Sequence, residues 1–251
     1  MAYLPVGRPL AGNLNDMRDP GNVRRVHNWT RPYTISMYRL SKLFTWVGLE
    51  SFLNREFDQI PQGARVLMVG ADGPIARILS RYAHRSAFEV VGFDIDPLRG
   101  PSVVGDLCSA PFRSGAFDVA VLGEVLEHVH SPQLAIDGIH RLLAPGGRLI
   151  LTTPFLFPIH ERPRDYYRFT RYGLEWLLRN FRSVTVAPRG TWAEAINAMG
   201  VRLFMEPELR PRLLAPFVMI VAIICLPLAR LIGRLVPSDF LTIGYTVTAL
   251  R

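Results

Sequence analysis

The stretch RVLMVGADGPIARILSRYAHRSAFEVVGFD, residues 65–94, places an apolar run, a helical stretch and a second apolar run in succession. The alternation continues through FDVAVLG (117–123), a helix expected over 132–143, and GRLILTTP (147–154). Runs that are apolar at nearly every position are typical of parallel strands covered by helices on both faces. The sequence therefore predicts an α/β fold built on a doubly wound, mostly parallel sheet.

The remaining segments indicate how this core is extended. A helix near 170–180, a strand near 183–187 and a β-branched strand over 241–250 follow the core. About fifty residues separate the last two strands, which is too long for a hairpin loop and predicts a helical insertion. Before the core, the apolar spacing over 33–57 predicts one or two amphipathic helices, which either cover a substrate pocket or simply pack on the sheet.

We expect four segments along the chain. They are an N-terminal arm with lid helices (1–60), a cofactor-binding catalytic core (61–190), a hydrophobic helical insertion (191–239) and a terminal strand that completes the sheet (240–251). The 251 residues, 49% of them hydrophobic, are enough for one sizeable core. The only two cysteines, Cys108 and Cys225, predict no disulfide framework, and residues 1–22 do not read as a secretory signal, so we expect a cytoplasmic protein.

The net charge of +8 is unevenly distributed. Residues 162–251 carry 13 basic and 6 acidic groups, whereas 61–161 carry 8 and 10. An acidic middle argues against a basic nucleic-acid stripe across the cofactor region, so no nucleic-acid partner is expected. Positive charge beside the most hydrophobic segment fits a membrane surface better.

Glycines and acidic residues follow successive predicted strands. In chain order they are the loop Gly70-Ala71-Asp72-Gly73, then Asp94, Asp106 and Glu124. Ligands of open α/β sheets bind outside the carboxyl ends of the strands, where the strand order reverses. We therefore expect these residues to surround one ligand.

The charge of this loop discriminates between cofactors. Asp72 at a helix start would repel the diphosphate of a dinucleotide, but it tolerates the ammonium and sulfonium of S-adenosylmethionine (SAM). Asp94, or less favourably Asp96, is suited to accept hydrogen bonds from ribose hydroxyls. Asp106 is suited to the adenine amine, with Ile95 and Leu107 as apolar neighbours of the cofactor. Each aspartate alone could equally be a cap or turn residue.

Two segments, GDLCSAPFRSGAFDVAVLGEVLEHV (105–129) and LLAPGGRLILTTPF (142–155), resemble the class I SAM-dependent methyltransferases, and the resemblance extends over about 65–181. It implies a Rossmann-like, seven-stranded sheet with an antiparallel last strand, and SAM as the cofactor. It also implies cofactor contacts, which fall at Gly70, Asp94, Asp106, Leu107 and Glu124.

The first strand and its loop depart from the pattern of that family. Met68 stands where the family usually has an acid, and Gly70, Asp72 and Pro74 stand where it has three alternating glycines. The alternative to an enzyme is therefore a catalytically inactive SAM-fold binding or scaffolding module.

The segment PFLFPIHERPRDYYRFT (154–170) brings polar groups to the rim where an acceptor should bind. Methyl transfer needs alignment and, for a hydroxyl acceptor, a general base, for which we name His160, with Glu124 as a second catalytic residue. The predicted acceptor contacts are His160, Glu161, Arg164, Asp165, Tyr166 and Tyr167. The alternative is that they satisfy loop backbone groups while Asp165 pairs with an arginine.

The predicted reaction is O-methylation of a small-molecule, glycan or lipid-linked acceptor. Segments like PIHE and DYYRFT occur in similar methyltransferases beside polysaccharide and natural-product genes, and this resemblance implies a sugar or secondary-metabolite hydroxyl. Glu124, Glu127 and His128 could instead ligate magnesium or zinc, but their spacing is better explained by a short helix, so no metal is expected.

The sequence LLAPFVMIVAIICLPLA (213–229) has no charged residue and is flanked by arginines. It falls short of the ~20 residues that a spanning helix needs, and Pro216 and Pro227 are expected to shorten its regular part. A single crossing would also separate the last strand from its sheet. We therefore expect 213–236 to contact the inner face of a membrane peripherally, or else to form a homodimer interface or a substrate lid.

Overall fold

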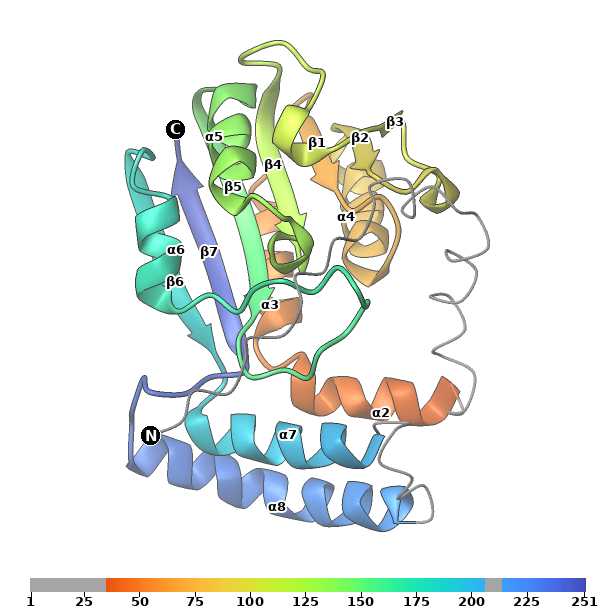
Figure 1. Ribbon diagram of the computed structural model, residues 1–251, viewed down its shortest axis with the longest axis vertical. Coiled ribbons are helices and arrows are strands. Elements are labelled where there is room, and N and C mark those ends of the chain that lie inside the picture. Colours follow the sequence, from red (N-terminus) through yellow and green to blue (C-terminus); the bar gives the residue numbers. More distant parts are fainter. Residues whose placement is uncertain (1–34, 206–213) are drawn as a thin grey trace, which may run out of the picture.

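The computed structural model describes residues 35–205 and 214–251 (Figure 1). Its strands form one seven-stranded sheet in the order β3-β2-β1-β4-β5-β7-β6. The strands are β1 (Arg65–Val69), β2 (Glu89–Asp94), β3 (Val103–Val104), β4 (Phe117–Gly123), β5 (Leu143–Pro154), β6 (Ser183–Arg189) and β7 (Gly244–Leu250). Neighbours among β1 to β5 are parallel, and β7 lies antiparallel between β5 and β6. The predicted fold class is confirmed.

Helices cover both faces of the sheet. One face is covered by α3 (Leu49–Asp58) and α4 (Pro74–Ser86), and the other by α5 (Pro132–Leu142) and α6 (Arg171–Leu177). The other described helices are α2 (Ile35–Thr45), α7 (Trp192–Met205) and α8 (Ala215–Leu235). Side chains alternate between the two faces: Met68 of β1 packs in the cluster with α3 and α4, and its neighbours Leu67 and Val69 pack in the cluster with α5 and α6. This double coverage explains why the strand sequences are apolar at nearly every position.

The start of α4, the helix that connects β1 to β2, is determined by Gly73 and Pro74. Gly73 precedes α4 with a φ of 118°, a conformation that L side chains rarely adopt, and Pro74 occupies the first turn, where its missing N–H costs no helical hydrogen bond. Ile75, Ile78 and Leu79 then bury one face of the helix against the sheet. The strand, turn and helix therefore lead the chain from β1 over the sheet to β2.

The carboxyl ends of the central strands lie level with one another. Val69, the last residue of β1, pairs with Phe93 of β2 on one side and with Leu122 of β4 on the other. The chain passes from β1 toward β2 and β3, and then returns to β4 on the opposite side. This reversal is the topological switch point at which such sheets bind their ligands.

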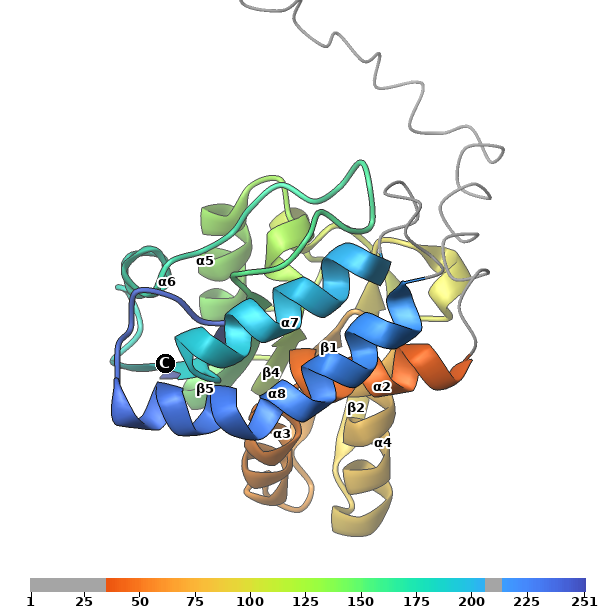
Figure 2. The same cartoon turned by 90° about the horizontal axis from the view of Figure 1, so that it is seen from below.

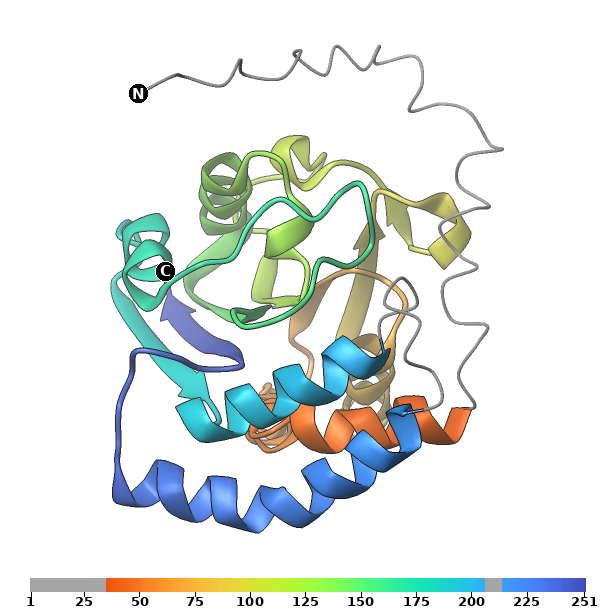
Figure 3. The ribbon, with the colours of Figure 1, turned by 60° about the horizontal axis from the view of Figure 1, so that its bottom comes forward.

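A separate helical layer lies beyond these carboxyl ends. Figures 1 and 3 show α2, α7 and α8 past the ends of β1, β4 and β5, with the chain over 155–170 between the sheet and the helices. Buried residues of all three helices share one small core with Ile243, and they include Phe44, Ala195, Ala198, Met219 and Ala222. Helix α2 and the two helices of the insertion, α7 and α8, therefore cover the carboxyl ends of the parallel strands.

Within this layer α7 and α8 form an antiparallel pair, which Figure 2 shows from below. The Trp192 indole N–H donates to the Val236 carbonyl at 2.9 Å, and the Asn197 amide donates to the Ala222 carbonyl at 3.0 Å. The expectation that Pro227 would shorten the helix is wrong. Helix α8 is 21 residues long and includes Pro227 in its interior, because a proline removes a backbone hydrogen bond from only one turn of the helix. The predicted four-segment division stays a prediction, and its N-terminal arm over 1–34 lies outside the described residues.

Candidate active site

The loop after β1 comes close to the end of β4. Gly70 has a φ of +85°, and a Cβ there would lie 3.0 Å from Val125 Cγ2. The Gly70 N–H donates to the Phe93 carbonyl of β2 at 3.0 Å. A side chain at position 70 would thus be strained and would crowd Val125, so the glycine lets the loop pass close to the end of β4 and keeps its own backbone free of a side chain at the switch point.

Asp94 connects that loop to the end of β2. Its carboxylate is buried, and its Oδ2 accepts the Ala71 N–H at 3.0 Å while Oδ1 accepts the Asp96 N–H at 2.9 Å. Both oxygens keep a second lone pair, as an ionised carboxylate offers about four acceptor positions. Ile95 beside it is 54% exposed. The remaining lone pairs of Asp94 fit the hydroxyls of a ribose, and the exposed Ile95 fits an apolar contact with the cofactor.

The two other predicted aspartates have local partners. Asp106 Oδ1 accepts the Cys108 N–H at 2.9 Å and caps a 3-10 turn that begins at the buried Leu107. Asp72 Oδ1 accepts the Gly73 N–H at 2.6 Å and lies 3.3 Å from the Arg77 guanidinium, with the Asp72 side chain 62% exposed. The structure thus brings Ala71 and Asp94 into direct contact, whereas Asp72 is directed toward an arginine on α4.

Glu124 follows β4 in a left-handed conformation, with a φ of +55°. Its N–H donates to the Thr152 carbonyl at 2.9 Å, and its Oε1 lies 3.1 Å from Nη2 of Arg189. Arg189 ends β6 and its side chain is only 3% exposed. This arginine is not among the site residues that the sequence patterns predicted. The sequence shows only that Arg189 is a charged residue at the end of a strand, and no sequence pattern indicates that it pairs with Glu124.

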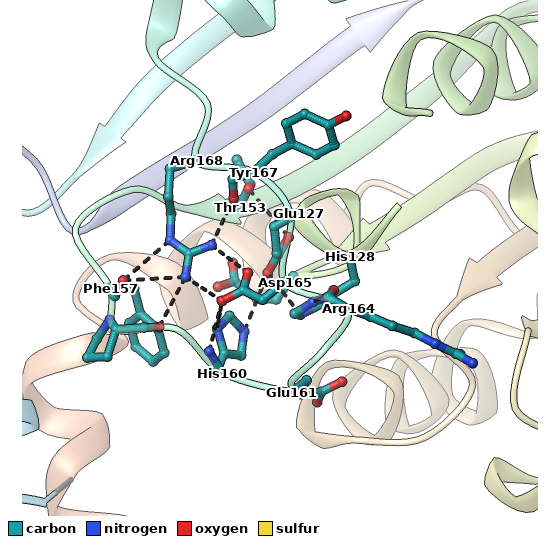
Figure 4. A network of polar contacts seen from close by, with 12 residues as sticks. Glu127, His128, Thr153, Phe157, His160, Glu161, Arg164, Asp165, Tyr167 and Arg168 are labelled. Carbon is teal, nitrogen blue, oxygen red and sulfur yellow. Dashed lines mark hydrogen bonds and ion pairs between the residues drawn. The ribbon is translucent and has the colours of Figure 1, made fainter. Parts of the chain in front are cut away.

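The chain over 155–170 is organised by an ion pair (Figure 4). Asp165 Oδ1 and Oδ2 accept hydrogen bonds from Arg168 at 2.6 and 2.8 Å, and Oδ2 also accepts the His160 N–H at 2.8 Å. Arg168 further donates to the Phe157 and Pro158 carbonyls. Burial by itself would raise the pKa of Asp165, but the hydrogen bonds from Arg168 and the His160 N–H outweigh burial and lower this pKa to about 2.

Two imidazoles and one carboxylate meet beside this pair. His160 Nδ1 lies 3.2 Å from Asp165 Oδ2, and His160 Nε2 lies 3.9 Å from Glu127 Oε1. His128 approaches the same oxygen, with Nε2 at 3.7 Å, and its ring packs edge-to-face on His160. The Glu127 side chain is fully buried, and burial, followed by the negative charge of Glu124, raises its pKa well above the usual range.

The other predicted acceptor residues serve different contacts. Glu161 lies 3.1 Å from the Arg99 guanidinium, so the chain over 155–170 reaches the turn that follows β2. The backbone N–H groups of Tyr166 and Tyr167 both donate to the Glu127 carbonyl, and the Arg164 carbonyl lies 2.7 Å from His128 Nδ1. Of the predicted acceptor set, His160 and Asp165 come together near Glu127, and the remaining residues hold the loop in place.

Comparison with known proteins shows the family to which this chain belongs. The family described as "Methyltransferase domain" matches residues 43–203. The chain therefore belongs to the methyltransferase domain family, whose members with this fold are SAM-dependent class I methyltransferases. The predicted family, fold, enzyme class and cofactor agree with this membership. The open backbone at Gly70 and the carboxylate at Asp94 fit the adenosine part of SAM.

Curated proteins of similar sequence match about half of this chain. The "Ubiquinone biosynthesis O-methyltransferase" of Psychrobacter cryohalolentis is 33% identical over 135 residues, which is 47% of this chain and 49% of that protein. The protein with the same description from Xanthomonas oryzae pv. oryzae is 37% identical over 146 residues, covering 51% and 54%. The chain thus spans about half the length of the curated relatives it matches.

Solved structures agree with the observed architecture. A SAM-dependent methyltransferase from Archaeoglobus fulgidus superposes with a TM-score of 0.55 at 13% identity, covering 81% of this chain and 93% of that one. The phosphoethanolamine N-methyltransferase 2 of Haemonchus contortus, in complex with SAM, gives a TM-score of 0.51 at 16% identity, covering 81% and 52%. At these identities the likeness shows the fold alone.

Proposed function

We propose that this chain transfers a methyl group from SAM to a hydroxyl oxygen of a small-molecule, glycan or lipid-linked acceptor. The observation that carries the proposal is the Asp165 and His160 pair, which stands at the switch-point end of the sheet with an imidazole nitrogen directed toward Glu127. The relatives described as O-methyltransferases support oxygen as the methylated atom.

His160 is the proposed general base. Its Nδ1 faces the carboxylate of Asp165 at 3.2 Å, which favours the proton on Nδ1 and leaves a lone pair on Nε2. SAM, when bound, supplies a methyl carbon already activated by the sulfonium. As the acceptor oxygen bonds to that carbon and the carbon–sulfur bond breaks, His160 Nε2 takes the hydroxyl proton. Asp165 then stabilises the resulting imidazolium.

The proposed cofactor site runs along the carboxyl ends of β1, β2 and β4. Asp94 accepts the ribose hydroxyls, Ile95 and Leu107 flank the adenine, and Asp106 accepts the adenine amine. Glu124 is the proposed second catalytic residue, because its partly exposed carboxylate lies where the positive sulfonium would bind. Arg189 holds that carboxylate from the buried side. The remaining contacts are proposed at Gly70, Ala71 and Gly73, with a weaker one at Asp72, whose exposed carboxylate lies 3.3 Å from Arg77.

Product analysis tests the reaction. The full chain is incubated with methyl-labelled SAM and separate panels of phenols, sugars and polyprenyl-linked sugars, and the products are examined by mass spectrometry. Label recovered in a methyl ether supports the proposal, whereas label recovered only on nitrogen or carbon contradicts O-methylation. If SAM produces neither heat nor a thermal shift at millimolar concentration, the alternative of an inactive binding module is favoured.

We further propose that α8 contacts the inner, cytoplasmic face of a membrane. Among the described residues, Pro216–Leu235 is the one helix long and apolar enough to cross a membrane, yet only 22% of its apolar window is buried. Its outward side chains are large and apolar, and they include Phe217, Ile220, Ile224, Leu228 and Leu235. A soluble core helix would bury them, so this face calls for a partner.

Charge and position favour a bilayer over a second copy of the chain. A groove of about 890 Å³ between α2, α4 and α8 carries the basic residues Lys42, Arg77, Arg81 and Arg230, with Glu50 as its acidic residue. Helix α8, which carries the apolar face and lines one side of this groove, lies beside α2 and α7 at the carboxyl ends of the parallel strands (Figure 2). β7 pairs with β5 and β6 after α8, which disfavours a single crossing. The helix would therefore lie in the interface plane.

A further inference from the structure

Three potential metal ligands meet at one point beside the proposed base. Glu127, His128 and His160 each offer one ligand atom, and these atoms lie within 4.8 Å of one another. Nε2 of His128 is 3.7 Å from Glu127 Oε1, and Nε2 of His160 is 3.9 Å from the same oxygen. Figure 4 shows both rings directed toward the carboxylate.

The outer contacts of the two imidazoles determine which nitrogen is free to ligate. His128 Nδ1 lies 2.7 Å from the Arg164 carbonyl, which can only accept, so this nitrogen carries the hydrogen. His160 Nδ1 lies 3.2 Å from an oxygen of Asp165, which favours the same tautomer. Both Nε2 atoms therefore point lone pairs toward Glu127. Ligating histidines in metal sites are oriented in this way by a carbonyl or carboxylate on the other nitrogen.

Glu127 lacks a partner for one of its oxygens. Its side chain is fully buried, Oε2 receives the Thr153 hydroxyl at 3.4 Å, and within the described residues Oε1 has no hydrogen-bond partner. Neighbouring guanidinium groups are already engaged, Arg168 with Asp165 and Arg189 with Glu124. A buried carboxylate oxygen facing two lone pairs is costly unless a proton or a metal cation lies between them.

We propose that Glu127, His128 and His160 together bind one divalent transition-metal cation. Metal–ligand bonds of about 2.1 Å in tetrahedral geometry separate ligand atoms by about 3.4 Å. The two distances to Glu127 Oε1 therefore need to close by about 0.3 to 0.5 Å, and the two imidazole nitrogens, which lie within 4.8 Å of each other, by up to about 1.4 Å. Two imidazoles with one carboxylate suit zinc, manganese or iron(II) better than magnesium or calcium. His160 thus takes the place of Glu124 in the ligand set considered from the sequence, because Glu124 is paired with Arg189.

This site rests on the proposed O-methylation and replaces its proton step, because a cation on His160 Nε2 would prevent that nitrogen from acting as the base, so the cation would activate the hydroxyl in its place. With the cation bound, an acceptor hydroxyl on an open coordination position loses its proton to water at a lower pKa, and its oxygen attacks the methyl carbon. Binding of the cation needs neither SAM nor an acceptor. Its measurement can therefore fail or succeed independently of methyl transfer.

Titration of the chelator-treated full chain with Co²⁺ tests the site. We expect one cation per chain, with visible d–d absorption and no thiolate charge-transfer band, and Zn²⁺ binding at the same stoichiometry by calorimetry. Glu127→Gln and His128→Asn should each weaken binding more than about 100-fold, beyond the effect of losing an outer partner. The asparagine amide can still donate to the Arg164 carbonyl, so the fold is retained, which equal thermal unfolding would verify.

A second cluster on the chain provides the matched control. Asp106, Cys108 and His130 also bring ligand atoms together, with Cys108 Sγ 3.9 Å from His130 Nδ1. Cys108→Ser should leave Co²⁺ affinity unchanged if the cation binds at Glu127. A thiolate band that disappears in Cys108→Ser, affinity unchanged in both Glu127→Gln and His128→Asn, or no binding at millimolar Co²⁺ would each overturn the proposal.

Discussion

The carboxylate of Glu124 and the guanidinium of Arg189 form an ion pair at 3.1 Å, and the arginine side chain in it is almost fully buried. The two residues are 65 positions apart in the chain and come from the ends of β4 and β6. A Cβ at position 244 would lie 2.4 Å from Arg189 Nη2, so Gly244 at the start of β7 leaves the space for this guanidinium.

Removal of this arginine should destabilise the fold strongly. Arg189→Met leaves Glu124 without its cation, and because the Glu124 side chain is 30% exposed, the cost is smaller than for a fully buried pair, about 2 to 3 kcal/mol. The exposed pair Arg77 and Asp72 provides the control, because Arg77→Met should change the free energy of unfolding by no more than about 1 kcal/mol. Urea unfolding of both variants measures the difference. Equal stabilities would show that the Arg189 pair is not a buried structural contact.

Asp165 should make the free energy of unfolding depend on pH in the acidic range. Its pKa is about 2 in the folded chain and its ordinary value is 3.8. Because the folded value is the lower one, the stabilisation is complete above about pH 4 and is lost as pH falls toward about 2. A shift of this size corresponds to about 2 kcal/mol. Unfolding followed from pH 6 to pH 2 should show this loss in the native chain and a flatter profile in Asp165→Asn.

His160→Asn separates catalysis from cofactor binding. The asparagine amide can replace the Nδ1 donor toward Asp165 but has no counterpart of Nε2, so kcat should fall about 10²- to 10⁴-fold while the Kd for SAM stays within about twofold. His84→Asn, at an exposed position near the end of α4, provides the control and should keep full activity. An unchanged kcat in His160→Asn would remove His160 from the reaction.

The carboxylates near the first loop should differ in their effect on SAM binding. Asp94→Asn loses an acceptor next to Ala71, so the Kd should rise about 10- to 100-fold, as expected when a charged hydrogen-bond acceptor is lost. Asp72→Asn should raise it less than about threefold, because that carboxylate is exposed and occupied by Arg77. Calorimetry compares the two variants. The reverse order would favour the cofactor contact that the sequence suggested for Asp72.

Local patterns predicted most of the fold, because strand periodicity and the residues at strand ends are read along a continuous chain. The positions of Gly70 and Asp94 followed from this, since each ends a strand of a parallel sheet. The partners of Glu124 and Glu127 did not, because Thr153 reaches Glu127 from the neighbouring strand β5, and Arg189 reaches Glu124 from the end of β6, 65 positions further along the chain. The continuation of α8 as one helix through Pro227 likewise depends on packing against α7, which no local propensity encodes.

The exposed face of α8 should determine whether the protein binds membranes. Ile224 and Leu228 are 70% and 57% exposed, and replacing both with glutamate places two negative charges in the face that would contact an anionic bilayer. We expect the native chain to float with vesicles of phosphatidylglycerol and phosphatidylcholine, and the double variant to lose at least about tenfold in partitioning. Leu134→Glu, an equally exposed apolar position on α5, should bind like the native chain. If the native chain ignores vesicles and instead sediments as a dimer that the double variant dissociates, α8 is an interface between two copies.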